Sequence, residues 1–432
     1  MLKKQMLDVS DNPEERSKIV VCTVGKETSE SLPLIINKLK PEIVYALCGE
    51  EQIDVVVSVL SILRGIKYKL ILVDDKDPRE ITQKVFHTFN YLINRFMRDK
   101  IFLDATAGNR LLCSLATSVA CIFGIKTFFT IKEDGAKMLE VSNPFEKYGL
   151  VLMSQAVNLY SHHFYRASME IFAQIRERAT EITLGMLSSA LSMLSQAYMA
   201  WDQFIYKGEN GAYTMLRQLS KELSKIKQFI KYAAEMKGVV DHNLHFLGNL
   251  LGSTKGGKEI SPFLILDIFM NGKRRFEESR FDEAVIRFYR CVEGSVQYRL
   301  ARHHSIDPSS PSLEKLGDRK LKRYLKLIGK TVPPLRLSLF DGYVLLRKIL
   351  KDKFALKLRE KDLKALMYSR NHSILSHGLG IVDHDVALAF MKRTARVIEV
   401  LFAEENIDIE SAKSDAKFLE LRESNVYAAL ST

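Results

Sequence analysis

The sequence predicts an α/β domain followed by a long all-α region. Residues 19–141 alternate short apolar runs with helical patterns, which is typical of a mostly parallel, doubly wound sheet of Rossmann type. Beyond them no run has the pattern of a strand, and apolar residues recur at helical spacing. We therefore divide the chain into an α/β domain (1–148), a helical linker (149–260) and an all-α bundle (261–432).

Turn residues bound each apolar run of the first domain. The predicted strands are 19–23, 43–48, 69–73, 101–104, 127–131 and 137–141, and the predicted helices are 32–39, 55–63, 81–97 and 111–123. Glu133-Asp134-Gly135 indicates a hairpin between the last two strands.

Polar or glycine-bearing loops follow three of these strands, where ligands of such sheets bind. The candidate ligand-binding residues are Thr23, Val24, Gly25, Gly49, Glu50, Asp104, Thr106, Gly108, Asn109 and Arg110. Residues 104–110 lead into a helix, whose free N–H groups favour a phosphate, and Gly108 permits close backbone approach. Alternatively, Gly108 only makes a tight turn. The sequence has no G-x-G-x-x-G, which argues against an NAD site.

The region after residue 148 is helical in pattern. Helices are expected at 160–175, 215–229, 263–278 and 281–299, then three or four more to about residue 404, before a short charged tail. Residues 252–258 match most of a phosphate-binding G-x-x-x-x-G-K loop. Because Glu259 stands where Ser or Thr would hold magnesium, we expect a connector. Residues 263–299 have tetratricopeptide character but no sustained repeat.

Composition indicates an ordinary globular protein with a basic surface. The chain has 432 residues and a net charge of +12, and residues 314–364 contain 16 Lys or Arg against 6 Asp or Glu. This region suits a polyanion, although a solvated basic face is the alternative. Five cysteines, an odd number, suggest reduced thiols in a cytoplasm, and no apolar run is long enough to span a membrane.

The histidines outside the C-terminal motif are not expected to carry chemistry. His242 and His245 have no Cys or carboxylate cluster nearby in the sequence, so we predict no metal site. The pairs at 162–163 and 303–304 are expected at the surface.

A helical stripe near the C-terminus contains an Arg and a His where packing residues are expected. Positions 363, 370 and 377 are seven apart, so they return to nearly one face, with Arg370 and His377 roughly 10 Å apart at ~1.5 Å per residue. An Arg can stabilise charge on a phosphodiester, and a His can transfer a proton. Alternatively, Arg370 pairs with an acid and His377 caps its own helix. Gly378 is a natural helix stop.

Four stretches resemble CRISPR-associated proteins that join a CARF sensor domain to a HEPN ribonuclease. Residues 370–378 resemble the R-x(4–6)-H motif of HEPN ribonucleases, and residues 280–293 resemble an early HEPN helix. Residues 103–110 are similar to the D-x-T-G-G-[TN]-[KR] signature of CARF domains, with Ala107 at the first Gly, and residues 23–25 match the family's first loop.

The resemblance implies a Rossmann-like CARF domain, a helical linker and a HEPN bundle in a cytoplasmic homodimer. It implies that cyclic tetra- or hexa-adenylate activates cleavage of single-stranded RNA in type III CRISPR antiviral defence. No metal or other cofactor is implied, and the products carry 2′,3′-cyclic phosphate and 5′-hydroxyl ends. The implied catalytic residues are Arg370, which holds the phosphate, Asn371, which orients the helix or nucleotide, and His377, which acts on the 2′-hydroxyl or leaving oxygen.

Two other functions stay open from the sequence. The chain could be a non-catalytic sensor of cyclic nucleotides whose helical domain binds nucleic acid or protein. It could also be a toxin-like nuclease that does not respond to a ligand. The presence of both Arg370 and His377 argues against the non-catalytic sensor.

Overall fold

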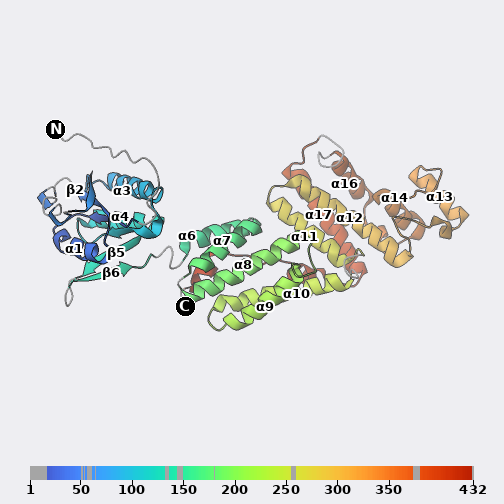
Figure 1. The fold of residues 1–432 in the computed structure, drawn as a ribbon. Coiled ribbons are helices and arrows are strands. Elements are labelled where there is room, and N and C mark those ends of the chain that lie inside the picture. The colour runs from blue at the N-terminus through green and yellow to red at the C-terminus, as the bar shows by residue number, and fades with distance from the viewer. Residues whose placement is uncertain are drawn as a thin grey trace. The chain divides into compact units, whose positions relative to one another are not determined.

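The chain folds into two compact units. The computed structural model describes residues 17–49, 52, 54–55, 61–63, 65–131, 136–143, 149–179, 181–253, 259–372 and 380–430. One unit comprises Met1–Val151 with Arg178–Glu181, and the other comprises Leu152–Glu177 with Ile182–Thr432. The first contains the sheet, and the second is helical (Figure 1). The second unit spans the boundary predicted at residue 260.

Six strands form a single sheet in the first unit, in the order β3-β2-β1-β4-β5-β6. Their bounds are β1 (Ile19–Thr23), β2 (Ile43–Gly49), β3 (Lys67–Val73), β4 (Ile101–Asp104), β5 (Lys126–Ile131) and β6 (Lys137–Val141). The first five are parallel, and β6 is antiparallel to β5. The predicted mostly parallel sheet is therefore confirmed.

Helices cover both faces of this sheet because alternate strand residues are apolar on both sides. Val20 and Cys22 of β1 pack on the side of α1 (Thr28–Leu39). Ile19 and Val21 pack on the side of the helices α3 (Pro78–Ile93) and α4 (Arg110–Phe123). The strand order turns back at β1 and β4, so the crevice typical of ligand binding lies beyond their carboxyl ends.

The second unit contains no strand among its described residues. Its helices are α6 (Leu150–Ser161, which begins at the unit boundary), α7 (Tyr165–Arg178), α8 (Ile182–Asp202), α9 (Ala212–Ile226), α10 (Lys231–Ser253), α11 (Pro262–Glu277), α12 (Phe281–His304), α13 (Asp318–Ile328), α14 (Leu339–Val344), a π-helix (Leu345–Leu350), α15 (Lys353–Lys357), α16 (Glu360–His372), α17 (His384–Glu404), α18 (Ile409–Asp415) and α19 (Glu423–Leu430). The single helix expected at 160–175 is wrong. His163, at φ 64°, separates α6 from α7.

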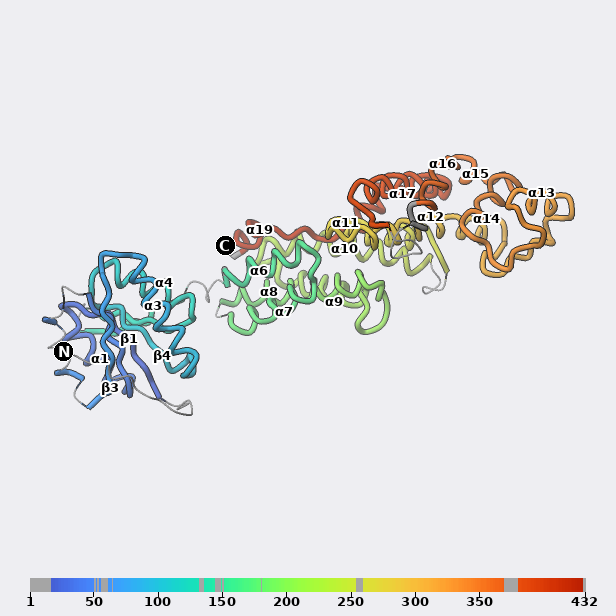
Figure 2. The backbone as a smooth tube through the Cα atoms, turned by 90° about the horizontal axis from the view of Figure 1, so that it is seen from above, coloured from blue at the N-terminus to red at the C-terminus, as the bar shows by residue number. Residues whose placement is uncertain are grey.

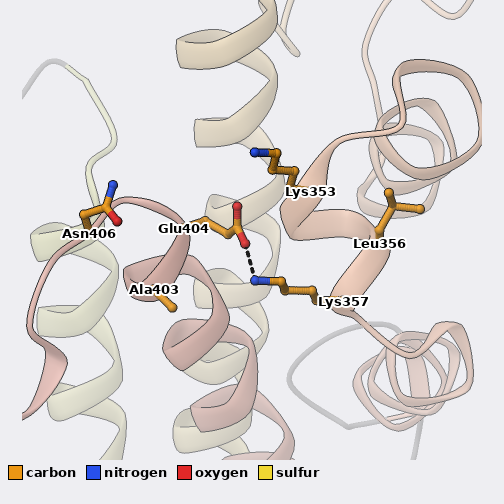
Figure 3. Close-up of a pocket in the computed structure, with 6 residues that line it drawn as sticks. All are labelled: Lys353, Leu356, Lys357, Ala403, Glu404 and Asn406. Atoms are coloured by element: carbon orange, nitrogen blue, oxygen red, sulfur yellow. Dashed lines mark ion pairs between the residues drawn. The ribbon is translucent and has the colours of Figure 1, made fainter.

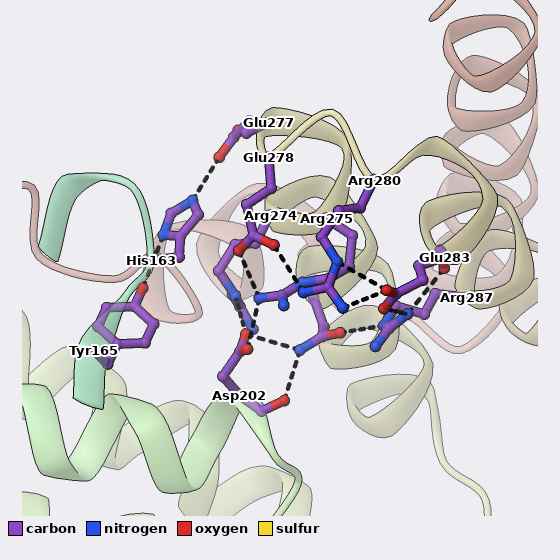
Figure 4. A network of polar contacts seen from close by, with 11 residues as sticks. His163, Tyr165, Asp202, Arg274, Arg275, Glu277, Glu278, Arg280, Glu283 and Arg287 are labelled. Carbon is purple, nitrogen blue, oxygen red and sulfur yellow. Dashed lines mark hydrogen bonds and ion pairs between the residues drawn. The ribbon is translucent and has the colours of Figure 1, made fainter. Parts of the chain in front are cut away.

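A buried polar network joins α8, from the predicted linker, to α11, from the predicted bundle. The Asp202 carboxylate accepts from Arg274 Nε at 2.7 Å and from Arg275 Nη2 at 2.7 Å (Figure 4). Both arginines are buried. Breaking such a pair leaves a charge without its partner in a poorly solvated place, so the network fixes the two helices together.

The C-terminal tail returns to the middle helices, whereas the sequence indicated only a short charged segment. Phe418 stacks on Tyr198 of α8 at 3.9 Å between ring centroids. The Arg274 guanidinium lies 4.1 Å from the same Phe418 ring. Asn243 of α10 donates to the backbone oxygens of Asp415 and Lys417. The tail is therefore part of the core of the second unit. In the described part of the chain, no helix combines the length and apolarity needed to cross a bilayer.

Candidate functional site

The loops after β1 and β4 touch each other backbone to backbone at the crevice of the sheet. A Cβ on Gly25 would lie 2.2 Å from the Gly108 nitrogen, so this contact requires glycine at 25. Gly108 has a φ of 116°, in the region that favours glycine, and its own Cβ would lie 3.2 Å from the Val24 oxygen. Both the tight turn and the close approach therefore apply to Gly108, but the close approach here is between two loops of the chain.

The Asp104 side chain holds the loop after β4 in place from its buried side. One of its carboxylate oxygens accepts from the Thr106 nitrogen at 3.1 Å and from the Thr106 hydroxyl at 2.5 Å. The other accepts from Ser31 Oγ of α1 at 3.2 Å. Burial raises the pKa of this carboxyl, and the hydrogen bonds from Thr106 and Ser31 oppose that rise. Asp104 is buried and thus positions the loop through Thr106, which is partly accessible.

The groups free to meet a ligand lie at the start of α4 and on the loop after β1. Asn109 caps α4 by accepting from Leu112 N at 2.7 Å, and its amide donates to Asp75 O at 2.8 Å. Arg110 and Lys26 are exposed and make no side-chain contact with another residue that the structure describes. An N-terminal helix turn with two free cations nearby suits a phosphate.

The predicted ligand residues therefore divide into three groups. The buried residues, which shape the crevice, are Thr23, Val24, Gly25, Gly49 and Asp104. Thr106, Gly108, Asn109 and Arg110 are at least partly accessible. Glu50 lies outside the described residues. Sequence reasoning missed Lys26 as a candidate, although it adjoins Gly25 in the same loop.

Two of the three predicted nuclease residues lie at the end of α16. Arg370 and Asn371 belong to this helix, of which the structure describes the backbone there, and His377 lies outside the described residues. Leu363 and Leu366 of α16 are buried, at 2% and 0% exposure. Position 370 follows them at helical spacing on the same stripe.

A basic cavity of about 180 Å³ opens on that stripe of α16 against α17. Leu363, Leu366 and Val397 line its apolar floor. The basic residues in its wall are Lys357, Arg359, Arg393 and Arg396. Arg393 Nε lies 3.8 Å from Asp362, whereas Arg359 and Arg396 make no side-chain contact with another described residue. Two free guanidinium groups beside the face that carries Arg370 suit a phosphate chain.

Another cavity of the same unit, about 500 Å³, lies between α15 and the end of α17 (Figure 3). Its wall contains an ion pair of 2.5 Å between Lys357 and Glu404, and none of its described lining residues belongs to the Arg–His motif. It is therefore a weaker candidate for the site of cleavage.

Several histidines outside the motif contact carboxylates. His242 and His245 each contact Asp415 through Nδ1 at 2.7 Å, which ties α10 to the tail. His163, expected at the surface, is only 17% exposed and contacts Glu277 at 3.1 Å (Figure 4). His304, 22% exposed, contacts Asp352 at 3.0 Å. Among the described residues no group of three or more His, Cys, Asp or Glu is arranged to hold a metal ion.

Residues 254–400 match the family model of the Csm6 HEPN domain. The second unit contains a Csm6-type HEPN domain. The matched segment includes α11, α12, α16 and most of α17, and the whole Arg–His motif. The match indicates a ribonuclease of HEPN type, and the predicted all-helical fold of this domain is confirmed.

A solved structure of *Enterococcus italicus* Csm6, bound to cyclic hexa-2'-fluoro-hexa-dAMP, has the same fold. The TM-score is 0.58 at 12% identity, over 96% of this chain and 100% of that one. With the HEPN match, it confirms the predicted resemblance to CRISPR-associated CARF–HEPN proteins.

Two more distant structures also match. *Vibrio cholerae* VC1899 has a TM-score of 0.24 at 11% identity, over 55% of this chain and 69% of that one. *Sulfobacillus thermosulfidooxidans* Can2, in complex with cyclic tetra-adenylate, has a TM-score of 0.24 at 12% identity, over 54% and 68%. Nothing further follows from these two. No curated protein sequence matches the chain.

Proposed function

We propose that this protein is an endoribonuclease that cyclic oligoadenylate activates, acting on single-stranded RNA in type III CRISPR antiviral defence in the cytoplasm. The observation that carries the proposal is the match of residues 254–400 to the Csm6 HEPN domain. That segment contains Arg370, Asn371 and His377, the residues on which the sequence resemblance rests. The basic cavity beside the Arg370 stripe supports an RNA substrate.

The proposed chemistry is an internal transfer within the RNA. The ribose 2′-hydroxyl loses its proton and attacks the adjacent phosphorus. The bond to the 5′-oxygen of the next nucleotide breaks, and that oxygen gains a proton. The products are a 2′,3′-cyclic phosphate and a 5′-hydroxyl, with no metal ion required. Arg370 neutralises the phosphate, His377 transfers a proton, and Asn371 orients the nucleotide or the helix.

The proposed activator binds at the crevice of the sheet in the first unit. The structure of *E. italicus* Csm6 holds a cyclic hexanucleotide analogue, and the two chains share a fold. In this chain the start of α4, Arg110 and Lys26 offer free donors to phosphates beyond the ends of β1 and β4. Cyclic tetra- and hexa-adenylate are the two ligands to compare.

The experiment is an RNA cleavage assay on the purified chain. Labelled single-stranded RNA is incubated with cyclic tetra-adenylate, cyclic hexa-adenylate or neither, each with and without EDTA. We expect cleavage that one of the rings stimulates and EDTA does not inhibit, with cyclic phosphate ends seen by mass spectrometry. Cleavage that neither ring changes would indicate a nuclease without a ligand switch. Binding of a ring without cleavage would indicate a regulator.

A further inference from the structure

The basic region of the HEPN domain contains two kinds of cation. Several of those next to α14 and α16 have partners: Lys330 contacts Asp341 at 2.9 Å, and Lys364 contacts Glu360 at 2.9 Å. Arg347 donates to the backbone oxygens of Ala355, Leu356 and Leu358. These charges are used in holding the domain together.

The cations in and around α13 have no partners of this kind. Within the described part of the chain they make no side-chain hydrogen bond or ion pair, and all are exposed. These residues are Lys315, Arg319, Lys320, Lys322, Arg323, Lys326 and Arg336. The acidic residues of the same stretch are Glu314 and Asp318, both exposed. The unpaired positive charge of residues 314–336 is therefore larger than its negative charge.

Four of these cations form one stripe. Arg319, Lys322, Arg323 and Lys326 follow the spacing i, i+3, i+4, i+7, which brings them to one face of α13. Tyr324 is the buried residue of the helix and lies on the opposite face, where its hydroxyl donates to Asp341 O at 3.2 Å. Because Tyr324 is buried on one face of α13, the four cations on the opposite face point toward solvent.

The stripe opposes helix formation, because like charges four residues apart repel. Arg319 faces Arg323 in this way, and Lys322 faces Lys326. No acidic side chain that the structure describes forms an ion pair with any of the four cations. An external polyanion would compensate for the repulsion. The stripe is roughly 10 Å long, and a stacked strand carries a phosphate about every 3.4 Å, so it spans about three phosphates.

Helix α13 lies at the outer end of the second unit, beyond α14, in both views of the structure (Figure 1, Figure 2). It packs on α14 and the π-helix, whereas α16 packs on α12 and α17. The stripe is therefore separate from the Arg–His motif, although both belong to the HEPN domain.

We propose that the stripe of Arg319, Lys322, Arg323 and Lys326 binds the phosphate backbone of the substrate RNA away from the bond that is cut. This proposal rests on the proposed ribonuclease function. The contacts are to phosphates, so they add affinity without selecting a base sequence. They also favour long RNA, because a short oligonucleotide bound at the Arg–His motif does not reach α13.

The test compares two variants with equal loss of charge. One replaces Arg319, Lys322, Arg323 and Lys326 with Gln. The control replaces with Gln four exposed cations of α9, the loop after it and the start of α10, which have no described side-chain partner: Arg217, Lys221, Lys227 and Lys231. Affinity for a labelled single-stranded RNA of about 30 nucleotides is measured by fluorescence anisotropy over a salt series. Circular dichroism checks that both variants are folded.

We expect the stripe variant to bind this RNA at least tenfold more weakly and the control to bind nearly as the parent does. The slope of log affinity against log salt should become shallower by about 2, at roughly 0.7 for each of about three lost phosphate contacts. Where cleavage is measurable, KM for the long RNA should rise with kcat largely retained. Equal affinities and slopes for the two variants would overturn the proposal.

Two further outcomes are distinguishable from that one. If the stripe variant changes only the oligomeric state in sedimentation, the surface is an interface between copies and the proposal is wrong. If the parent cleaves no RNA with any ligand, the ribonuclease proposal fails. The binding comparison still decides whether the stripe is an RNA surface.

Discussion

Asp267 is a carboxylate that the helical unit buries almost completely, at 1% exposure. It accepts from Trp201 Nε1 at 2.7 Å and from the Tyr206 hydroxyl at 2.6 Å. Burial raises its pKa to about 6, although Arg274 and the two donors oppose the rise. In the unfolded chain an Asp has a pKa of about 3.9. Folding therefore makes this group hold its proton more tightly.

This difference predicts a pH dependence of stability. Between about pH 4 and 6 the folded chain holds a proton that the unfolded chain has released, so the contribution of Asp267 falls as pH rises through this window. Relative to Asp267→Asn, the parent should gain about 1 kcal/mol in unfolding free energy from pH 6 to pH 5. Urea titrations of both proteins at the two pH values measure this. If the parent instead lost unfolding free energy relative to Asp267→Asn from pH 6 to pH 5, Asp267 would be ionised in the folded chain.

Arg370 and His377 should each be essential for cleavage under the proposed mechanism. Arg370→Ala and His377→Ala should lower the cleavage rate by about 10²–10⁴-fold, because one removes charge stabilisation and the other a proton transfer. His372→Ala, at the end of α16 and off the stripe of Leu363 and Leu366, should have a much smaller effect. Single-turnover cleavage of labelled RNA measures all three. A dead His372→Ala with an active His377→Ala would contradict the assignment.

Residue roles could be predicted from sequence only where the neighbours are close in the chain. The loop residues Asp104 to Arg110 were found because a strand end, a glycine and a helix start follow one another. Asp202 and Arg274 were missed because their contact joins helices far apart in the sequence, and neither lies in a motif. The paired role of His163 was missed for the same reason.

At the scale of elements, the loops after β1 and β4 pack against each other as one structural unit, and some of their residues are accessible to solvent. Arg110→Gln changes only an exposed cation, so it should weaken binding of the activating cyclic oligoadenylate with little change in stability. Gly25→Ala drives a Cβ into Gly108, so it should weaken binding and stability together. Calorimetric titration and thermal unfolding separate the two effects. Unchanged affinity in Arg110→Gln would move the ligand to another surface.

One aromatic side chain of the C-terminal tail, Phe418, makes several contacts with the middle helices. Phe418→Ala removes the stacking on Tyr198 and the contact with the Arg274 guanidinium, so it should lower the unfolding free energy by roughly 3 kcal/mol. Phe229→Ala is a matched control because Phe229 is 56% exposed. Urea unfolding compares them. Equal effects would mean that the tail contributes little to the core.

The strands were predictable because each is a short, largely apolar run bounded by turn residues, and the long helices because apolar residues recur about every 3.6 positions. All six strands lie within two residues of their predicted bounds. The break between α6 and α7 depends on one backbone angle, at His163, which no apolar pattern reports. The tail was missed because α18 and α19 are short, and Phe418 between them acquires its partners only in the fold.

At the scale of the whole molecule, the proposal assigns the ligand to one compact unit and the cleavage to the other. Each unit folds around its own core, so binding in one changes cleavage in the other only if the ligand prefers one arrangement of the molecule. The size of the activation is limited by the difference between the affinities of the ligand for the two arrangements. In a homodimer, two alternative packings of the chains at their symmetric interface would be such arrangements.

We predict that the protein is a homodimer and that its activity requires both chains. A cyclic oligoadenylate has rotational symmetry, so two identical crevices facing each other across a two-fold axis fit it. One Arg370–His377 pair supplies few groups for cutting a phosphodiester, whereas two pairs can enclose it. The measurement is sedimentation at assay concentration, followed by mixing an Arg370→Ala chain with a His377→Ala chain.

The mixed dimer distinguishes a shared site from two separate ones. If both chains build a single site, the heterodimer should have an activity that the average of the two inactive homodimers does not give. The control mixes each variant with more of itself, which keeps the total concentration constant. Because a monomer has only one motif, full activity in a monomer at assay concentration would rule out a site built by two chains.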